Sequence, residues 1–236
     1  MPLRLGHRGH RLAAYGETEN TLAAFDRALA AGCEGLELDL RLSGDGRVVI
    51  HHDAEMRLDH GRGQSAAIAG ATLRALRRLH PELATLEQVL ERYGERAWLD
   101  LEVKEKAAAA ATAAALRRHP PRQGFVVSSF DPAALVRLRS AAPELPLCLN
   151  LRRPVSPRRL RRFQVPWIAP QQASCTAWYV RRLRQAGWRV LVWTVNRPVR
   201  MRRFARAGAE AIVSDDPYLL VQTLPRSRTA EQTAWN

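Results

Sequence analysis

Short strand-like runs alternate with amphipathic or alanine-rich helical stretches along almost the whole chain, and this alternation limits the folds that the sequence can adopt. Strands that alternate with helices form a parallel sheet, because each parallel connection needs a dozen or more residues. The strands are expected at residues 3–8, 34–40, 97–103, 125–129, 147–151, 167–169, 189–195 and 211–214. Eight such strands close a (β/α)8 barrel, and 236 residues are a normal length for one.

One further strand-like run, residues 47–52, does not fit the alternation. Six residues, 41–46, which end in the Ser-Gly-Asp-Gly turn at 43–46, separate it from the run at 34–40, and this is too short for a helical crossover. An open doubly wound sheet would need a glycine-rich phosphate loop after an early strand, and the chain has none. We therefore predict a TIM (β/α)8 barrel with a short antiparallel β extension after the second strand. Residues 1–224 are expected to form this single domain, and 225–236 a mobile tail.

Helix boundaries follow from local signals. Gly32 ends a helix at 22–31, and Asp131-Pro132 begins another, because Asp caps helix N-termini and Pro fits the first turn. Further helices are expected at 73–79, 86–93, 107–118, 173–186, 199–207 and 218–224.

Arginine dominates the charged residues. The chain has 37 Lys and Arg against 23 Asp and Glu, a formal net charge of +14, and its only lysines are Lys104 and Lys106. Between Leu145 and Ala209 there are fifteen arginines and no acidic residue. Such a chain attracts nucleic acid or anionic lipid, but it carries no helix-turn-helix, zinc-finger or RNA-binding signature. We expect no specific nucleic-acid partner and at most a weak attraction to membrane surfaces; nothing in the sequence specifies an oligomeric state.

The same composition indicates a cytoplasmic protein. No apolar stretch approaches the roughly 18 residues of a membrane span, and the N-terminus carries charges where a signal peptide needs an apolar run. Cys33, Cys148 and Cys175 lack metal-ligand spacing, which predicts reduced, buried thiols.

Acidic side chains gather at the ends of two predicted strands. Glu37 and Asp39 alternate with leucines, so both point to the same side of their strand. Glu102 and Lys104 do the same on the next barrel strand. Three ionised carboxylates meeting in a barrel mouth would be costly, so they are expected either to take up protons or to bind a cation. Hard oxygen ligands suit Mg²⁺ or Ca²⁺ better than zinc.

Histidines mark the same end of the barrel. His7 ends the first strand, and the doublet His51-His52 ends the folded-back run; counting from the Gly turn, and keeping the His-Asp pair together, selects His52. Two histidines near a cation, with Arg8 and Lys104 as anion contacts, suit displacement at a phosphoester. The other histidines are expected in solvent: His10, His60, His80 and His119.

Several motifs, in order and spacing, resemble glycerophosphodiester phosphodiesterases. They are His-Arg-Gly at 7–9, Glu-Asn-Thr at 19–21, the runs at 35–39, 43–53 and 99–104, and weaker matches at 126–131, 192–196 and 211–217. The resemblance implies a TIM barrel that hydrolyses glycerophosphodiesters to sn-glycerol 3-phosphate and an alcohol with one divalent cation, Ca²⁺ or Mg²⁺. It implies nine site residues: the acid/base pair His7 and His52, the metal ligands Glu37, Asp39 and Glu102, and the substrate contacts Arg8, Glu19, Lys104 and Trp193.

Two alternatives remain open at this stage. A related barrel of the lysophospholipase D type would share the catalytic residues and act on a lipid, with an apolar rim to which Trp167 and Trp178 could contribute. A non-catalytic anion or nucleic-acid binder would instead use the arginine-rich residues 145–209.

Overall fold

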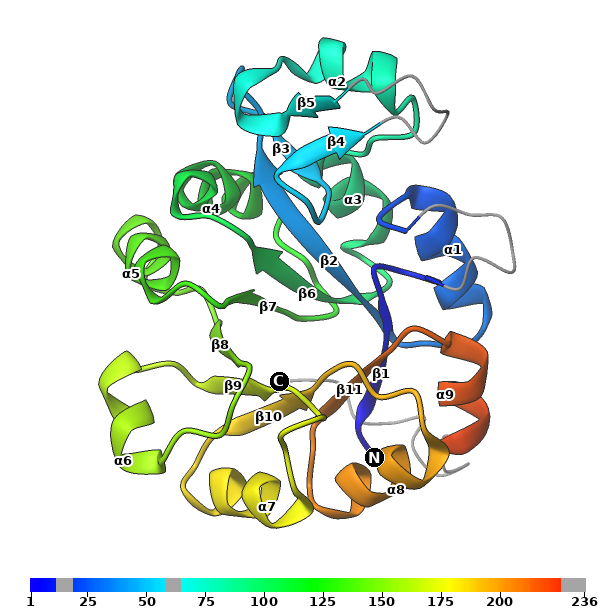
Figure 1. Cartoon of the computed structure of the whole chain (residues 1–236), viewed down its shortest axis with the longest axis vertical. Helices are drawn as coiled ribbons and strands as arrows, with labels where there is room; N and C mark the ends of the chain where they lie inside the picture. Colours follow the sequence, from blue (N-terminus) through cyan, green and yellow to red (C-terminus); the bar gives the residue numbers. More distant parts are fainter. Residues whose placement is uncertain (12–18, 58–64, 226–236) are drawn as a thin grey trace.

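The computed structural model describes residues 1–11, 19–57 and 65–225, and its centre is a closed barrel of eight parallel strands (Figure 1). Neighbouring strands follow the chain order around the barrel, and β11 pairs with β1 to close it. The barrel strands are β1 Leu3–His7, β2 Gly35–Leu42, β6 Trp98–Val103, β7 Phe125–Ser129, β8 Leu147–Leu151, β9 Trp167–Pro170, β10 Arg189–Val192 and β11 Ala211–Ser214. The predicted fold is therefore confirmed.

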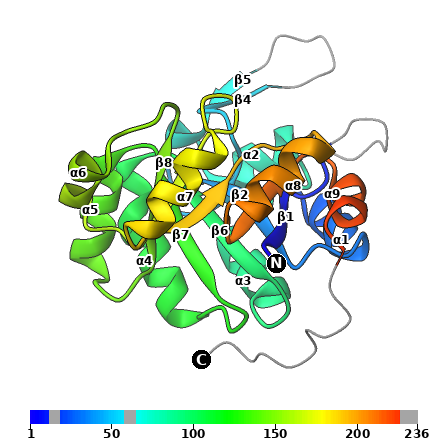
Figure 2. The ribbon, with the colours of Figure 1, turned by 90° about the horizontal axis from the view of Figure 1, so that it is seen from below.

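Helices cover the outside of the barrel and return the chain from the end of one strand to the start of the next (Figures 1 and 2). Threonine or aspartate side chains cap six of them, as in α5, where the Asp131 carboxylate accepts from the Ala133 N–H. The helices are α1 Leu22–Ala30, α2 Leu73–Leu79, α3 Leu86–Tyr93, α4 Ala109–Arg118, α5 Pro132–Ala141, α6 Pro157–Leu160, α7 Ala177–Gln185, α8 Pro198–Arg206 and α9 Pro217–Thr223.

The predicted antiparallel extension is also present. β3 (Val48–Ile50) pairs antiparallel with the end of β2, with Leu40 opposite Ile50. A second, separate hairpin of β4 (Glu55–Arg57) and β5 (Ser65–Ala67) was not predicted. Its strands have three residues each, which is too short to show a period in the sequence.

Inward-facing residues fill the barrel in layers. Large apolar side chains close its lower part, where Trp98 and Trp167 pack with ring centroids 5.6 Å apart. A side chain at Gly35 has no room there, since a Cβ would lie 2.2 Å from the Trp98 carbonyl oxygen. Because alternate residues of a strand face the same way, the next inward positions above this layer hold polar side chains. The fold thus places a layer of polar side chains at the carboxyl ends of the strands.

Several predicted boundaries were wrong. α7 begins at Ala177 rather than at 173, because the Thr176 hydroxyl caps it, and β10 ends at Val192 rather than at 195. The short helix α6 and the 3-10 helix η4 (Arg161–Phe163) were missed. Of the predicted tail, residues 226–236 lie outside the described part of the chain. Among the described residues, no helix has the length and apolar character needed to cross a membrane.

Candidate active site

Sheet register brings the predicted site residues of β1, β2 and β6 together at the barrel mouth. His7 lies opposite Glu37, Glu37 lies opposite Asp100, and Asp39 lies opposite Glu102. His7, Glu37 and Asp100 therefore form one layer of side chains, and Asp39 and Glu102 form the next. Neighbouring strands are about 4.8 Å apart, so the side chains within a layer lie close together. Carboxyl ends of barrel strands are where enzymes of this architecture place their chemistry.

Glu37, Asp39 and Glu102 form a compact carboxylate cluster. Each offers an oxygen within 4.8 Å of the others, and their exposed fractions are 5%, 1% and 9%. Burial raises the pKa of Glu37 well above its ordinary range, and the neighbouring Asp39 carboxylate adds to the shift. Burial likewise raises the pKa of Glu102. Burial thus opposes the ionisation of Glu37 and Glu102.

Asp39 is the member held most tightly in its ionised form. Although burial opposes its ionisation, the Lys104 ammonium and the Arg8 guanidinium keep its pKa below the ordinary value. Lys104 Nζ donates to Asp39 Oδ1 at 3.1 Å and to Glu102 Oε1 at 2.5 Å. Asn20 Nδ2 donates to Asp39 Oδ2 at 2.9 Å, and the Asp39 N–H donates back to Asn20 Oδ1.

A left-handed turn after β1 aims Arg8 at the cluster. Arg8 has φ 54° and Gly9 has φ 83°; a Cβ on Gly9 would lie 2.6 Å from the Ala24 carbonyl carbon, so this close approach to α1 needs glycine. The Arg8 N–H donates to Glu37 Oε2 at 3.0 Å, and its guanidinium pairs with Asp39 at 3.0 Å and Glu19 at 2.6 Å. The turn thus gives both the backbone and the side chain of Arg8 a role at the mouth.

His7 is oriented by a carboxylate from the other side of the closing seam. Its Nδ1 lies 2.6 Å from Asp215 Oδ1, and its Nε2 lies 3.7 Å from Glu37 Oε2. Asp215 follows β11 and is itself held by Asn196 Nδ2 at 2.5 Å. Although burial opposes ionisation, the bond from His7 lowers the pKa of Asp215 to about 2. Because a carboxylate only accepts, this contact assigns the hydrogen to Nδ1 and leaves Nε2 toward the cluster.

His52 stands on the other flank of the cluster, after β3. Its Nδ1 lies 2.8 Å from Asp53 Oδ1, and Arg41 Nε donates to its backbone oxygen at 2.8 Å. Burial and the nearby Lys104 ammonium lower the pKa of His52 below its ordinary value. The His51 side chain contacts backbone instead, with its Nδ1 3.0 Å from the Asp53 backbone oxygen.

A small cavity of about 20 Å³ lies between these groups, room for about one water molecule or ion. Its lining comes from six barrel strands or their ends: His7, Glu37, Asp100, Glu102, Asn150, Trp193 and Val213. Trp193 donates from Nε1 to the Ala169 oxygen at 2.9 Å and packs edge-on against Phe130, 5.3 Å between centroids. The mouth therefore has an acidic side and an aromatic side.

Comparison with known proteins assigns this sequence to a family. Residues 7–219 match the sequence model of the glycerophosphoryl diester phosphodiesterase family. The chain belongs to this family. A relative from Caldanaerobacter subterraneus subsp. tengcongensis, named glycerophosphodiester phosphodiesterase, is 27% identical over 239 residues, which cover 93% of this chain and 96% of the relative.

Solved structures of such phosphodiesterases share the fold. The Thermotoga maritima glycerophosphodiester phosphodiesterase has a TM-score of 0.78 and 28% identity, covering 94% of this chain and 98% of its own. A phosphodiesterase of Oleispira antarctica, solved with the product sn-glycerol-3-phosphate, has a TM-score of 0.80 and 27% identity, covering 94% and 96%. As a member of the phosphodiesterase family, the chain is an enzyme with a TIM barrel.

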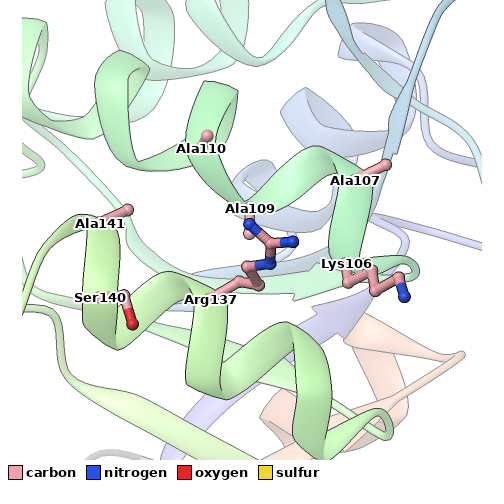
Figure 3. A pocket seen from close by; sticks show the side chains of 7 residues that line it. All are labelled: Lys106, Ala107, Ala109, Ala110, Arg137, Ser140 and Ala141. Carbon is pink, nitrogen blue, oxygen red and sulfur yellow. The ribbon is translucent and has the colours of Figure 1, made fainter.

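A larger cavity of about 550 Å³ lies away from this site, on the outside of the barrel between α5 and the start of α4 (Figure 3). Four alanines and Ser140 form much of its wall, and Arg137 extends from α5 toward α4. Lys106 and Arg137 are the charged groups of the lining, which contains no carboxylate and no histidine among the described residues. This cavity lacks the groups that phosphodiester chemistry needs.

The phosphodiesterase site contains residues that the sequence reasoning did not single out. Asn20 lies in the Glu-Asn-Thr motif and Asp215 in the Ser-Asp-Asp-Pro motif. The motifs carried the family resemblance, but no site role was predicted for these two residues. Asp100 accepts from the Ser128 hydroxyl at 2.6 Å, and burial raises its pKa to about 7. His10, expected in solvent, is fully buried and packs edge-on against Tyr218, because the turn at Gly9 carries the chain inward against α1. That expectation was wrong, whereas the predicted burial of all three cysteines is confirmed.

Proposed function

We propose that this enzyme hydrolyses glycerophosphodiesters to sn-glycerol 3-phosphate and an alcohol, with His7 and His52 as its acid/base pair. The observation that carries the proposal is the buried carboxylate cluster with one histidine on each flank. A phosphodiester needs charge neutralised on its oxygens and protons moved at the attacking and leaving oxygens. The family membership and the product complex of the Oleispira relative support the same reaction.

The donor set suits one divalent cation, Ca²⁺ or Mg²⁺. Glu37, Asp39 and Glu102 supply only carboxylate oxygens, which are hard ligands, and burial together with the neighbouring carboxylates raises the pKa of Glu37, a shift that a bound cation would oppose. Asp100 and Asn150 line the same cavity and add oxygen atoms near it. A cation bound there supplies a Lewis acid for the phosphate oxygens.

His52 takes the role of base in this proposal. Its lowered pKa leaves the imidazole neutral at pH 7, and its contact with Asp53 leaves Nε2 for the substrate. His7 acts as the acid when it carries a proton on both nitrogens: its Nδ1–H donates to Asp215, and its Nε2 proton passes to the leaving alkoxide, which leaves His7 neutral. The attacking oxygen is either water or the neighbouring glycerol hydroxyl.

Phosphate binding falls to the cations that already lie beside the cluster. Arg8 is buried and Lys104 half-buried at the mouth, where a guanidinium or ammonium interacts strongly with an anion. Glu19 positions Arg8 through its 2.6 Å contact and can accept from a substrate hydroxyl, while Trp193 offers an aromatic wall to the glycerol.

Release of glycerol 3-phosphate from a panel of glycerophosphodiesters tests the proposal. We expect activity that EDTA abolishes and that Ca²⁺ or Mg²⁺ restores, and we expect His7→Ala and His52→Ala to abolish turnover while the circular dichroism spectrum is unchanged. His51→Ala is the matched control and retains activity, because His51 lies outside the cluster contacts. Full activity of metal-free protein, or of either alanine variant, would refute the assignment. If the enzyme hydrolysed lysophosphatidylcholine in preference to glycerophosphocholine, the lysophospholipase D alternative would replace this proposal.

A further inference from the structure

Two exposed apolar side chains occupy the same position in neighbouring helices. Trp178 and Val199 are the second residues of α7 and α8, with 59% and 68% of their surface exposed. α7 and α8 contact each other on the outside of the barrel (Figures 1 and 2). In a (β/α)8 barrel the helices run antiparallel to the strands, so helix N-termini lie at the carboxyl ends of the strands. Both side chains therefore lie on the rim that surrounds the active-site mouth.

Exposed arginines stand at the same level of the barrel. Arg152 and Arg153 directly follow β8, and Arg197 directly precedes α8. We call these three arginines, together with Trp178 and Val199, the rim patch. No Asp or Glu occurs between residues 145 and 209, all of which the structure describes, so this segment brings no negative charge to the patch.

Hydrogen bonds connect the segments that carry the rim patch. The Ser174 hydroxyl, in the loop before α7, donates to the Arg152 oxygen at 2.8 Å. Arg200 of α8 donates to the Gln172 oxygen in that same loop at 2.8 Å. These bonds hold the loop after β8, the loop before α7 and the start of α8 together.

We propose that the rim patch docks the enzyme on anionic lipid membranes, with the active-site mouth facing the bilayer. Arginines attract anionic headgroups. A tryptophan beside them favours the membrane–water interface, because its apolar ring can enter the lipid while its N–H stays in contact with water. The Arg182 guanidinium covers one face of the Trp178 ring at 5.1 Å, so stacked nucleic-acid bases cannot use that face. An exposed valine has a partner in acyl chains and none in a polyphosphate backbone. The proposal goes beyond the proposed function and does not depend on it.

Vesicle flotation tests the docking without any hydrolysis. We expect the full-length protein to bind vesicles of phosphatidylcholine mixed with phosphatidylglycerol, and to bind pure phosphatidylcholine weakly. Added salt should weaken binding, because exposed charges are screened. Each arginine near an anionic surface contributes about fivefold, so Arg152→Gln with Arg153→Gln should weaken binding about 25-fold. Trp178→Ala should weaken it about tenfold by removing apolar burial.

Matched controls lie elsewhere on the barrel. Arg117 and Arg118 are also an exposed adjacent pair, at the end of α4 and hence at the opposite end of the barrel. Val136 of α5 is 58% exposed, one turn further from the rim than Val199. Arg117→Gln with Arg118→Gln, and Val136→Ala, should leave vesicle binding within about twofold of wild type, since single exposed contacts away from the membrane contribute little.

Three outcomes would overturn the proposal. The first is equal binding to neutral and anionic vesicles, or to neither. The second is an equal loss of binding when Arg117 and Arg118 are replaced. The third is that duplex DNA displaces the protein from the vesicles and that Trp178→Ala leaves the affinity for DNA unchanged. Quenching of tryptophan fluorescence by brominated lipid should be present in wild type and reduced in Trp178→Phe, because Trp178 is the highly exposed indole of the patch.

Discussion

Replacing Asp215 by asparagine should lower kcat by about 10- to 150-fold and leave KM nearly unchanged. The Asp215 carboxylate accepts three side-chain hydrogen bonds: Oδ1 accepts from His7 Nδ1 at 2.6 Å and from Arg11 Nη1 at 3.5 Å, and Oδ2 accepts from Asn196 Nδ2 at 2.5 Å. An amide has one oxygen and one NH2 group, so it can accept hydrogen bonds on only one of these two sides. If its oxygen faces Asn196, its NH2 group faces His7 and cannot accept the Nδ1 hydrogen, so it opposes the doubly protonated imidazole that gives a proton to the leaving group.

The magnitude follows from the bond that is lost. A hydrogen bond to a charged group contributes about 1.5–3 kcal/mol, and each 1.36 kcal/mol is a factor of ten in rate. The substituted side chain touches His7 rather than the cation-binding carboxylates, so substrate affinity should change little. Initial rates of glycerol 3-phosphate release over a range of substrate concentrations separate kcat from KM.

Asp216→Asn provides the matched control for this experiment. The neighbouring Asp216 carboxylate caps α9 by accepting from the Leu219 N–H at 2.9 Å, a role that asparagine fills equally well. This control should retain wild-type kcat. The reasoning is refuted if Asp215→Asn keeps kcat within about threefold of wild type, or if the loss appears in KM alone, since either result would separate His7 orientation from turnover.

The remaining predictions concern stability and pH. Arg4→Met should cost about 3–5 kcal/mol in urea unfolding, because Arg4 is buried against Glu34 and also satisfies the carbonyl oxygens of Gly32 and Leu224; a loss below 1 kcal/mol would contradict this. Gly35→Ala should destabilise by more than about 3 kcal/mol, since its Cβ would collide with backbone of β6, whereas Gly70→Ala, with open space, should be within about 1 kcal/mol of wild type. Asp215 has a pKa lowered to about 2, so its stabilisation is full above its unfolded value near about 4 and is lost as pH falls toward 2. The stability difference between wild type and Asp215→Asn should therefore shrink across that range, and a difference that stays constant down to pH 2 would count against the ion pair.

The barrel could be predicted because its signals are local and repeated. Each strand is an apolar run bounded by turn residues, and eight repeats leave few architectures. The positions of Glu37 and Asp39 followed from strand alternation alone, and the register with β6 then brings Glu102 beside them. Short elements gave no such signal: the strands β4 and β5 and the helix α6 have only three or four residues each.

Contacts between distant segments could not be predicted from the sequence, for a different reason. His7 and Asp215 are 208 residues apart and meet only because β11 closes the barrel against β1. His10 looked like a loop residue, yet the left-handed turn at Arg8 and Gly9 directs it into the protein. Such pairings depend on barrel closure and on backbone conformation at single residues, neither of which a local pattern encodes.

The charges of the site predict a coupling between cation and anionic ligand. The three carboxylates of the cluster face two cations, Arg8 and Lys104, so these five groups together carry one negative charge when all are ionised. A divalent cation on the carboxylates turns this into one positive charge and lets Arg8 and Lys104 exchange a carboxylate for a phosphate oxygen. Glycerol 3-phosphate should therefore bind about 5- to 150-fold more tightly with Ca²⁺ or Mg²⁺ present than in EDTA, the usual range of coupling between two sites. By linkage, the phosphate must tighten cation binding by the same factor, so calorimetric titration in both orders checks the result twice. Equal affinity for glycerol 3-phosphate with and without the cation would show that Arg8 and Lys104 do not change partners, and would remove them from phosphate binding.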